Sequence, residues 1–225
     1  MSRPSEERDA EVSMKVYLDC ETLPPDKNDP LVHNKIAQCT EEEYRKLALS
    51  SQWCRLLCIG LIIEGDDGEI IHRGVLGRDR STMRFHLDEG RTLRGFWNLL
   101  KAFDDRKDLL IGFNLLDFDL VVLCQRSIIK KIKPSFQVCF KRFCSRPVYD
   151  VMWAFQYWRH RISLDEVAQV LEIESSKRDG IDGSRVYDLF LEGRDDEIAS
   201  YCLNDVILTR SIYYRMNFIE MPDNV

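Results

Sequence analysis

The sequence of 225 residues lacks the apolar segments that membrane insertion or export requires. No run of about 18 uninterrupted apolar residues occurs, and the opening residues MSRPSEERDAEVS have no apolar centre like that of a signal peptide. We therefore expect a cytoplasmic protein with no membrane partner. Residues 1–13 are polar without periodicity, which predicts a disordered tail. The length and the 44% hydrophobic content suit a single domain over residues 14–221.

Histidine is scarce, and common catalytic motifs are missing. The four histidines show no ligand spacing, and neither a nucleophile triad nor a phosphate-binding glycine loop is recognisable. Several of the eight cysteines lie in apolar runs, which is typical of reduced thiols in a protein core. A zinc site remains an alternative, because the spacing within two pairs is loosely compatible with metal ligation: Cys54 and Cys58, Cys139 and Cys144.

The chain has fewer basic than acidic residues, and its formal net charge is -6. Taken as an average, this acidity argues against a protein that holds nucleic-acid phosphates. The distribution indicates the opposite, because residues 120–149 contain no Asp or Glu and three phenylalanines lie among the cations of this segment. A solvated surface is the alternative explanation. The cations are Arg126, Lys130, Lys131, Lys133, Lys141, Arg142 and Arg146.

The hydrophobic pattern predicts an α/β fold with a mixed central sheet flanked by helices on both faces. Strands are expected over residues 15–21 and 108–114, and an antiparallel hairpin over residues 54–65 and 69–77 turns at Asp67-Gly68. Helices are expected over residues 90–105, 116–132, 163–173 and 195–216. Residues 24–52 form an excursion of loop and helix, with Thr40 and Glu43 as a capping box.

Four acidic residues stand in apolar surroundings. Asp19 and Glu21 lie on one face of the first strand, and Asp119 stands at the start of an apolar helix. Asp205 follows Tyr201 by one helical turn. Carboxylates gathered in a low-dielectric site need a counterion, and all-oxygen ligands favour Mg²⁺ or Mn²⁺. The sequence therefore predicts a divalent metal site.

Three segments together resemble the DEDD 3'-to-5' exonucleases of the ribonuclease H-like superfamily, in the subclass with tyrosine in the third motif. They are VYLDCET (16–22), GFNLLDFDLVVL (112–123) and YCLNDVILT (201–209). The segments SLDEVAQVLEI and SSKRDGIDGSRVYDLFLEG are similar to stand-alone predicted exonucleases related to the proofreading domain of family-B DNA polymerases. This resemblance covers about residues 14–216 and implies a single exonuclease domain with a ribonuclease H-like fold.

The resemblance implies two-metal hydrolysis of single-stranded nucleic acid with a free 3' end, releasing nucleoside 5'-monophosphates. Asp19, Glu21 and Asp205 would ligate one ion, Asp19 would bridge to a second ion near Asp119, and Tyr201 would orient the attacking water. DNA is the expected substrate, with RNA or short oligonucleotides as the alternative. A catalytically inactive nucleic-acid-binding module is an alternative of another class. The presence of all four acids and the tyrosine argues against it.

Further residues are candidates for contact with nucleic acid. Asn114 matches the asparagine that precedes FD in the family, and it either contacts the terminal nucleotide or caps the helix expected from Leu116. Lys177 could reach a phosphate from its loop. For Asp150 we expect hydrogen bonding in a loop rather than metal ligation. The cationic segment contributes the candidates Lys130, Lys131, Lys133, Lys141 and Arg142.

Overall fold

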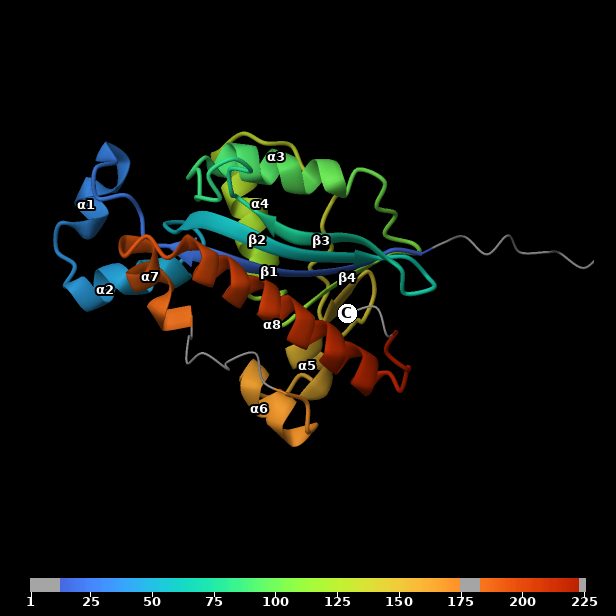
Figure 1. Ribbon diagram of the computed structural model, residues 1–225. Coiled ribbons are helices and arrows are strands. Elements are labelled where there is room, and N and C mark those ends of the chain that lie inside the picture. Colours follow the sequence, from blue (N-terminus) through green and yellow to red (C-terminus); the bar gives the residue numbers. More distant parts are fainter. Residues whose placement is uncertain (1–12, 175–182, 223–225) are drawn as a thin grey trace, which may run out of the picture.

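A computed structural model describes residues 13–174 and 183–222 of the chain. Five strands in these ranges form one sheet in the order β3-β2-β1-β4-β5 (Figure 1). They are β1 (Lys15–Leu23), β2 (Arg55–Glu64), β3 (Ile70–Leu76), β4 (Leu109–Gly112) and β5 (Val148–Asp150). β2 runs antiparallel to both of its neighbours, whereas β4 pairs parallel with β1 and with β5. The predicted mixed sheet and its hairpin are confirmed.

Helices cover both faces of this sheet. The α-helices are α1 (His33–Ile36), α2 (Glu41–Lys46), α3 (Glu89–Leu99), α4 (Asp119–Ile129), α5 (Val151–Phe155), α6 (Leu164–Val170), α7 (Val186–Leu191) and α8 (Asp195–Met216), and the short 3-10 helices are η1 (Pro30–Val32), η2 (Leu47–Leu49) and η3 (Gly183–Arg185). α3 and α4 lie on one face, and α5, α6 and α8 lie on the other (Figure 1). The predicted α/β class, a mixed central sheet with helices on both faces, is confirmed. None of the helices in the described ranges is long and apolar enough to span a membrane.

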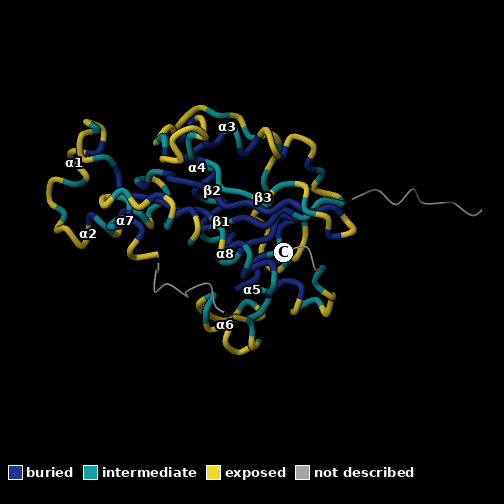
Figure 2. The backbone as a smooth tube through the Cα atoms, viewed as in Figure 1, coloured by how far each residue is buried: buried dark blue, intermediate teal, exposed yellow. Residues whose placement is uncertain are grey.

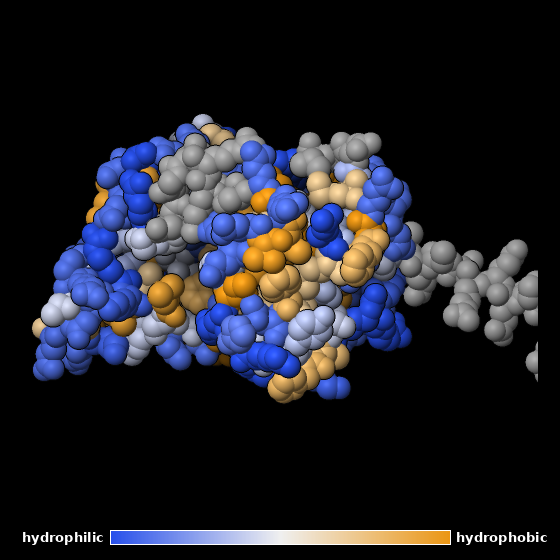
Figure 3. Space-filling view, turned by 90° about the horizontal axis from the view of Figure 1, so that it is seen from below, coloured by the Kyte–Doolittle hydropathy of each residue, from blue (hydrophilic) through white to orange (hydrophobic). Residues whose placement is uncertain are grey.

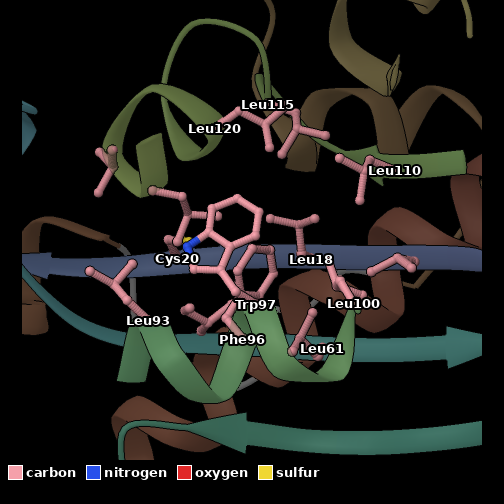
Figure 4. Packing of buried hydrophobic residues seen from close by; sticks show 14 of the residues in the cluster. Leu18, Cys20, Leu61, Leu93, Phe96, Trp97, Leu100, Leu110, Leu115 and Leu120 are labelled. Atoms are coloured by element: carbon pink, nitrogen blue, oxygen red, sulfur yellow. The ribbon is translucent and has the colours of Figure 1, made fainter. Parts of the chain in front are cut away.

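Side chains along β1 alternate between the two faces of the sheet, so this strand contributes residues to the core on both sides. Val16 and Leu18 pack into the core beneath α3 and α4, while Tyr17 packs beneath α8, because successive side chains of a strand point to opposite faces. On α3, Leu93, Phe96, Trp97 and Leu100 recur at helical spacing and point toward β1 (Figure 4). β1, β2 and β4 are almost entirely buried, whereas β3 at the edge of the sheet is not (Figure 2). The face seen from below in Figure 1, on which α6 lies, carries a patch of hydrophobic residues surrounded by hydrophilic ones (Figure 3).

The excursion at residues 24–52 contains the expected capped helix and brings a backbone segment toward β1. Thr40 and Glu43 form the predicted capping box of α2. The Thr22 hydroxyl at the end of β1 donates to the Ala48 carbonyl at 2.7 Å. The short helix α1 was not predicted, because its surroundings are rich in Pro, Asp and Asn.

Several helix boundaries differ from the prediction; α4 and α6, for example, end at Ile129 and Val170 rather than at residues 132 and 173. α3 ends at Leu99 rather than at residue 105, and α4 begins at Asp119 rather than at Leu116. The chain before α4 cannot be helical, because Asn114 adopts a positive φ of 57° and the Leu116 N–H donates to Asp150 at 2.9 Å. The proposal that Asn114 caps this helix is therefore wrong.

The predicted tail lies mostly outside the described residues, which begin at Ser13. Ser13 itself donates its backbone N–H to Asp66 at 2.6 Å. The boundary of the folded part therefore includes at least this last residue of the predicted tail.

α8 approaches the sheet most closely over Gly60 of β2, which is the register partner of Asp19 on β1. A Cβ at position 60 would lie 2.9 Å from Cys202 Sγ, 3.0 Å from Val206 Cγ2 and 3.1 Å from the Cys202 carbonyl oxygen. The first of these distances is shorter than real Cβ contacts, and the other two are tighter than nine in ten of them. The glycine thus permits α8 to lie directly on β2 beside the acidic end of β1.

Candidate active site

The two acids of β1 lie beyond the point where β4 ends its pairing with this strand. β4 is in register with β1 only as far as Tyr17, opposite Ile111. Asp19 and Glu21 follow on the face that α8 covers, and Glu21 is 8% exposed. The predicted placement of both carboxylates on one face of the strand is confirmed, and it puts them next to a helix rather than in solvent.

Asp119 closes the opposite side of the site. It is the first residue of α4 and is buried, and its Oδ1 accepts the backbone N–H of Cys20 at 2.9 Å. This carboxylate therefore takes the place of a neighbouring strand where β4 has ended, and the hydrogen bond holds α4 against β1.

Tyr201 and Asp205 reach the site from α8. Their spacing puts both side chains on one face of this helix. The Tyr201 phenol is hydrogen-bonded to Asp205. Burial is the largest cause that raises the pKa of Tyr201 well above 10, followed by the charges of Asp205, Glu21 and Asp19. At neutral pH the phenol is therefore protonated and donates to the carboxylate.

These five side chains surround one cavity of about 320 Å³. β1, α4 and α8 thus bring together every acid that the sequence singled out, along with the tyrosine. The cavity wall also includes backbone and side chains of the excursion and of the segments around α4 and α6. The further lining residues are Cys20, Thr22, Ala48, Leu49, Phe113, Asn114, Phe118, Met152, Arg161, Ile162 and Gly183.

Three of the four cavity acids have no basic partner among the described residues. Neither Asp19, Glu21 nor Asp119 forms an ion pair with a Lys or Arg within residues 13–174 and 183–222. Burial and then the neighbouring carboxylates raise the pKa of Asp19 and of Glu21 well above their usual values. Burial raises the pKa of Asp119 to about 8, against the lowering effect of the Cys20 N–H. Within the described ranges, the negative charges of Asp19, Glu21 and Asp119 are thus not balanced by a cation.

This donor set fits a hard divalent cation. Carboxylate oxygens are the ligands that Mg²⁺ and Mn²⁺ prefer, and such an ion would relieve the repulsion among the acids. The ligand atoms of Asp19, Glu21 and Cys202 lie within 4.8 Å of one another. Cys202 is an unsuitable ligand here, because a hydrogen bond with Cys58, burial and nearby acids raise the pKa of its thiol. The thiol instead donates to the Asp19 carbonyl at a sulfur–oxygen distance of 3.6 Å.

The cysteines do not assemble into the alternative zinc site. Within the described part of the chain, the metal-ligating group that forms contains neither Cys54 and Cys58 nor Cys139 and Cys144. All eight cysteines are free thiols, and Cys20, Cys54, Cys58 and Cys202 are buried. The core role expected for these buried thiols is confirmed.

Asn114 lies in the cavity wall with an unsatisfied polar atom. Its Oδ1 is buried and has no hydrogen-bond partner among the described residues, although its backbone N–H donates to Asp150 at 3.1 Å. Asp150 also accepts the N–H groups of Leu116 and Trp153, which is the loop role expected for it. An unpaired amide oxygen beside the acids is a ready acceptor for a substrate hydroxyl or amine.

Two arginines meet at the mouth of the cavity, and one of them was missed from the sequence. Arg142 and Arg161 both pair with Asp117, Arg161 at 3.0 Å. Arg161 also lines the cavity. Two guanidinium groups on one carboxylate leave a surplus of positive charge. No local motif marks Arg161, since only the tertiary fold brings residues 117, 142 and 161 together.

The predicted lysines do not line the cavity. Lys130 follows the C-terminal end of α4, and a helix of 11 residues separates its two ends by about 16 Å. Its Nζ pairs with Glu89 at 2.9 Å. The other described candidates are exposed and have no ion-pair partner in the described ranges: Lys131, Lys133 and Lys141. Lys177 lies outside the described residues.

Comparison with known families bears on this geometry. Residues 48–222 match the family described as "Predicted 3'-5' exonuclease related to the exonuclease domain of PolB". The chain belongs to this family. The expected membership in this family of predicted 3'-to-5' exonucleases is thereby confirmed. The match includes Asp119, Tyr201 and Asp205, whereas Asp19 and Glu21 precede the matched range and join the site through the fold.

The chain is also similar to solved structures of exonuclease I. A product-bound structure is 12% identical with a TM-score of 0.48, over 92% of this chain and 44% of that chain. E. coli exonuclease I is similar in complexes with a dT13 oligonucleotide (12% identity, TM-score 0.45, 90% and 41% of the two chains) and a dA16 oligonucleotide (11%, 0.48, 92% and 41%). This chain spans less than half of the length of these solved proteins. No curated protein matches it.

Proposed function

We propose that this protein is a 3'-to-5' exonuclease that removes nucleotides from single-stranded DNA with two divalent ions, Mg²⁺ or Mn²⁺. The observation that supports this most strongly is the convergence of four acids and Tyr201 in one cavity, where Asp19, Glu21 and Asp119 have no basic partner among the described residues. A fold that needed these acids for stability alone would balance them with arginine or lysine.

The residues that would hold the ions are Asp19, Glu21, Asp119 and Asp205. When bound, such ions lower the pKa of a water molecule and stabilise the negative charge that develops on the phosphate and on the leaving 3' oxygen. The bond from phosphorus to the 3' oxygen breaks while a bond from phosphorus to the water oxygen forms, so the product is a nucleoside 5'-monophosphate.

Tyr201 orients the attacking water in this proposal. Its O–H is directed to Asp205, so the free lone pairs of the phenol oxygen can accept a hydrogen bond from the water. The raised pKa of the phenol excludes it as the base at neutral pH. The role of Tyr201 is therefore to aim the water oxygen at the phosphorus rather than to remove its proton.

The remaining groups at the cavity would hold the 3' end of the strand. The unpaired Oδ1 of Asn114 faces the terminal nucleotide as an acceptor. Arg161 and Arg142 would pair with the phosphates that follow in the 5' direction, since their shared partner Asp117 neutralises only one of them. The exposed Lys131, Lys133 and Lys141 would contact the strand farther from the site, whereas Lys130 is already paired with Glu89.

Two observations support DNA and the cytoplasm as substrate and location. The family to which the chain belongs is related to the exonuclease domain of PolB, a DNA polymerase family. Free thiols at all eight cysteines suit the reducing conditions of the cytoplasm.

A polarity assay tests the proposal. Oligonucleotides of DNA and RNA, labelled at the 5' or the 3' end and single- or double-stranded, are incubated with Mg²⁺, Mn²⁺ or EDTA. We expect a descending ladder from 5'-labelled single-stranded DNA, immediate release of mononucleotide from the 3' label, and no cleavage in EDTA. Preferred cleavage of RNA, a 5'-to-3' ladder, or cleavage in EDTA would contradict the proposal.

A pair of neighbouring variants provides the control. Asp205→Asn removes a proposed ligand, while Asn204→Ala changes the exposed residue beside it on the same helix. We expect the first to lose the ladder and the second to retain it, with the same melting temperature in EDTA for the second variant as for the wild type.

A further inference from the structure

A second groove lies along the edge of the sheet that β3 forms. Its volume is about 530 Å³, and its walls come from β3, from the segment 77–86 that follows it, from α3 and from the N-terminal half of α8. Figure 1 shows β3 between these two helices. None of the five proposed catalytic side chains lines this groove. It is therefore separate from the catalytic cavity, and a ligand bound here would not depend on the proposed activity.

The floor of the groove is a free strand edge. β3 is the last strand in the sheet order and pairs only with β2. In the described ranges, no other segment makes a backbone hydrogen bond with Ile70–Leu76. The strand is seven residues long and contains no proline or lysine that would block a further strand. Its outer N–H and C=O groups thus form a template for an extended chain.

The fold does not require glycine at two positions of the groove, Gly74 and Gly95. Gly95 lies inside α3, where glycine costs about 1 kcal/mol relative to alanine, yet an added Cβ would have nothing within 4 Å. At Gly74, in the middle of β3, an added Cβ would meet only His72 Nε2 at 3.8 Å. Neither position has a positive φ. Both residues line the groove, and their missing side chains leave room for another backbone.

The walls of the groove carry a surplus of positive charge. Arg78, Arg80 and Arg91 line it together with Asp79. Arg78 pairs with Asp196 of α8 and Arg91 lies 3.6 Å from Asp79, so the surplus comes from Arg80. Arg80 is exposed and has no ion-pair partner among the described residues. In addition, His72 Nε2 is buried at the groove without a hydrogen-bond partner. An acidic ligand would therefore find both charge complementarity and an unused polar group.

We propose that this groove binds an extended acidic segment of a partner protein, which adds to the sheet as a further strand beside β3. The alternating donors and acceptors of a strand edge match a peptide backbone. A nucleic-acid backbone offers phosphate acceptors but would leave the outer carbonyls of β3 unmatched. A second copy of this chain is disfavoured, because pairing two β3 edges would bring together the exposed Arg73 and the groove arginines of both copies.

Selection of peptides on the purified full-length protein tests this proposal. A displayed library of random peptides about nine residues long, the length of a strand, is selected at low salt. We expect enrichment of extended sequences rich in Asp and Glu. One selected peptide is then synthesised with a fluorescent label, and its Kd is measured by anisotropy for the wild type, Gly95→Ala and Gly95→Leu. Hydrogen exchange of the backbone amides of Ile70–Leu76 is followed with and without peptide.

Comparison of two variants at Gly95 separates binding in the groove from an effect on folding. Gly95→Ala adds a methyl group in open space, so we expect unchanged or higher thermal stability and a similar Kd. Gly95→Leu places a side chain in the groove and should weaken binding about ten-fold or more, while nuclease activity on DNA is unchanged. Peptide should slow exchange in β3, and N-methylation of alternate peptide residues on the pairing edge should abolish binding.

Several results would overturn the proposal. These are no enrichment of acidic peptides, binding that Gly95→Leu leaves unchanged, or β3 amides whose exchange the peptide does not slow. Protection of β3 by a single-stranded oligonucleotide, or by self-association at rising protein concentration without peptide, would assign the groove to a different occupant.

Discussion

Buried acids in two regions of this protein have opposite surroundings. At one end of the sheet, Glu64 is fully buried and is paired with the buried Arg210, and it accepts the Tyr214 hydroxyl at 3.0 Å. At the other end, Asp19 and Glu21 face each other and Asp119 with no such partner among the described residues. α8 contributes to both regions, since Arg210 follows Asp205 by little more than one turn.

Glu89 shows the balanced arrangement a second time. It accepts two hydrogen bonds from Arg126, at 2.8 and 2.7 Å, and one from the backbone N–H of Leu56. Burial raises the pKa of Glu89, but the hydrogen bonds and charges of Arg126 and Lys130 lower it further, so it lies below the ordinary value. Among the described residues, cations thus pair with Glu64 and Glu89 in the core, whereas Asp19, Glu21 and Asp119 have no such partner.

The largest expected effect is on activity when an unbalanced acid is removed. Asp19→Asn should lower kcat on single-stranded DNA about a thousand-fold in Mg²⁺, because a proposed ligand shared by both ions is lost. The melting temperature in EDTA should not fall, since removing one of several repelling carboxylates relieves the site. Activity within a few-fold of wild type would contradict the assignment of Asp19.

Removal of a balancing cation should affect stability instead. Arg210→Met leaves Glu64 buried without a cationic partner, so we expect a loss of about 3–5 kcal/mol in the free energy of unfolding by urea. The double variant Glu64→Gln with Arg210→Met should recover much of this loss, because no unpaired charge remains. A single variant as stable as the wild type would show that the two regions do not differ in this way.

The unpaired acids of the cavity should make the thermal stability of the metal-free protein depend on pH. The pKa of Asp119 is about 8 in the folded chain and about 4 when unfolded. Below pH 4 both states hold the proton, but as pH rises toward 8 the unfolded state loses it first and is increasingly favoured. In EDTA, Asp119→Asn should therefore melt higher than the wild type by about 3 °C or more at pH 8 and by less at pH 5.

This pH difference has an internal control. Mg²⁺ at pH 8 should raise the melting temperature of the wild type more than that of Asp119→Asn. A difference between the two proteins that is constant from pH 5 to pH 8 would contradict the raised pKa.

The smallest expected effect concerns the surplus of positive charge at the mouth of the cavity. Arg161→Gln should raise KM for single-stranded DNA several-fold, leave kcat nearly unchanged and reduce the salt dependence of KM by the equivalent of about one phosphate contact. Gln keeps hydrogen-bonding capacity toward Asp117, so folding should be retained. An unchanged KM and salt slope would remove Arg161 from the substrate contacts.

Much of the fold followed from local patterns in the sequence. The alternation of β1, the turn at Asp67-Gly68 and the capping boxes of α2 and α6 depend on neighbouring residues, so they were predictable. The start of α4 was not, because Asp150, distant in sequence, binds the backbone that would have formed its first turn.

The site shows the same division. Asp19, Glu21, Asp119, Tyr201 and Asp205 each stand in a recognisable local motif. Arg161 and the pairing of Lys130 were not predictable, because they depend on which side chains the tertiary structure brings near Asp117 and Glu89. A run of cations indicates charge but not the direction in which each side chain points.

The close packing of α8 on Gly60 lies next to the proposed catalytic groups. Asp19 stands beside Gly60 in the sheet, and Cys202 and Val206, which rest on Gly60, each directly follow a catalytic side chain of α8. A single methyl group at position 60 would lift the helix and move Tyr201 and Asp205 away from Asp19, although it would touch neither substrate nor ion. The spacing of the proposed catalytic groups thus depends on the packing of α8 against the sheet, which the absence of a side chain at Gly60 of β2 permits.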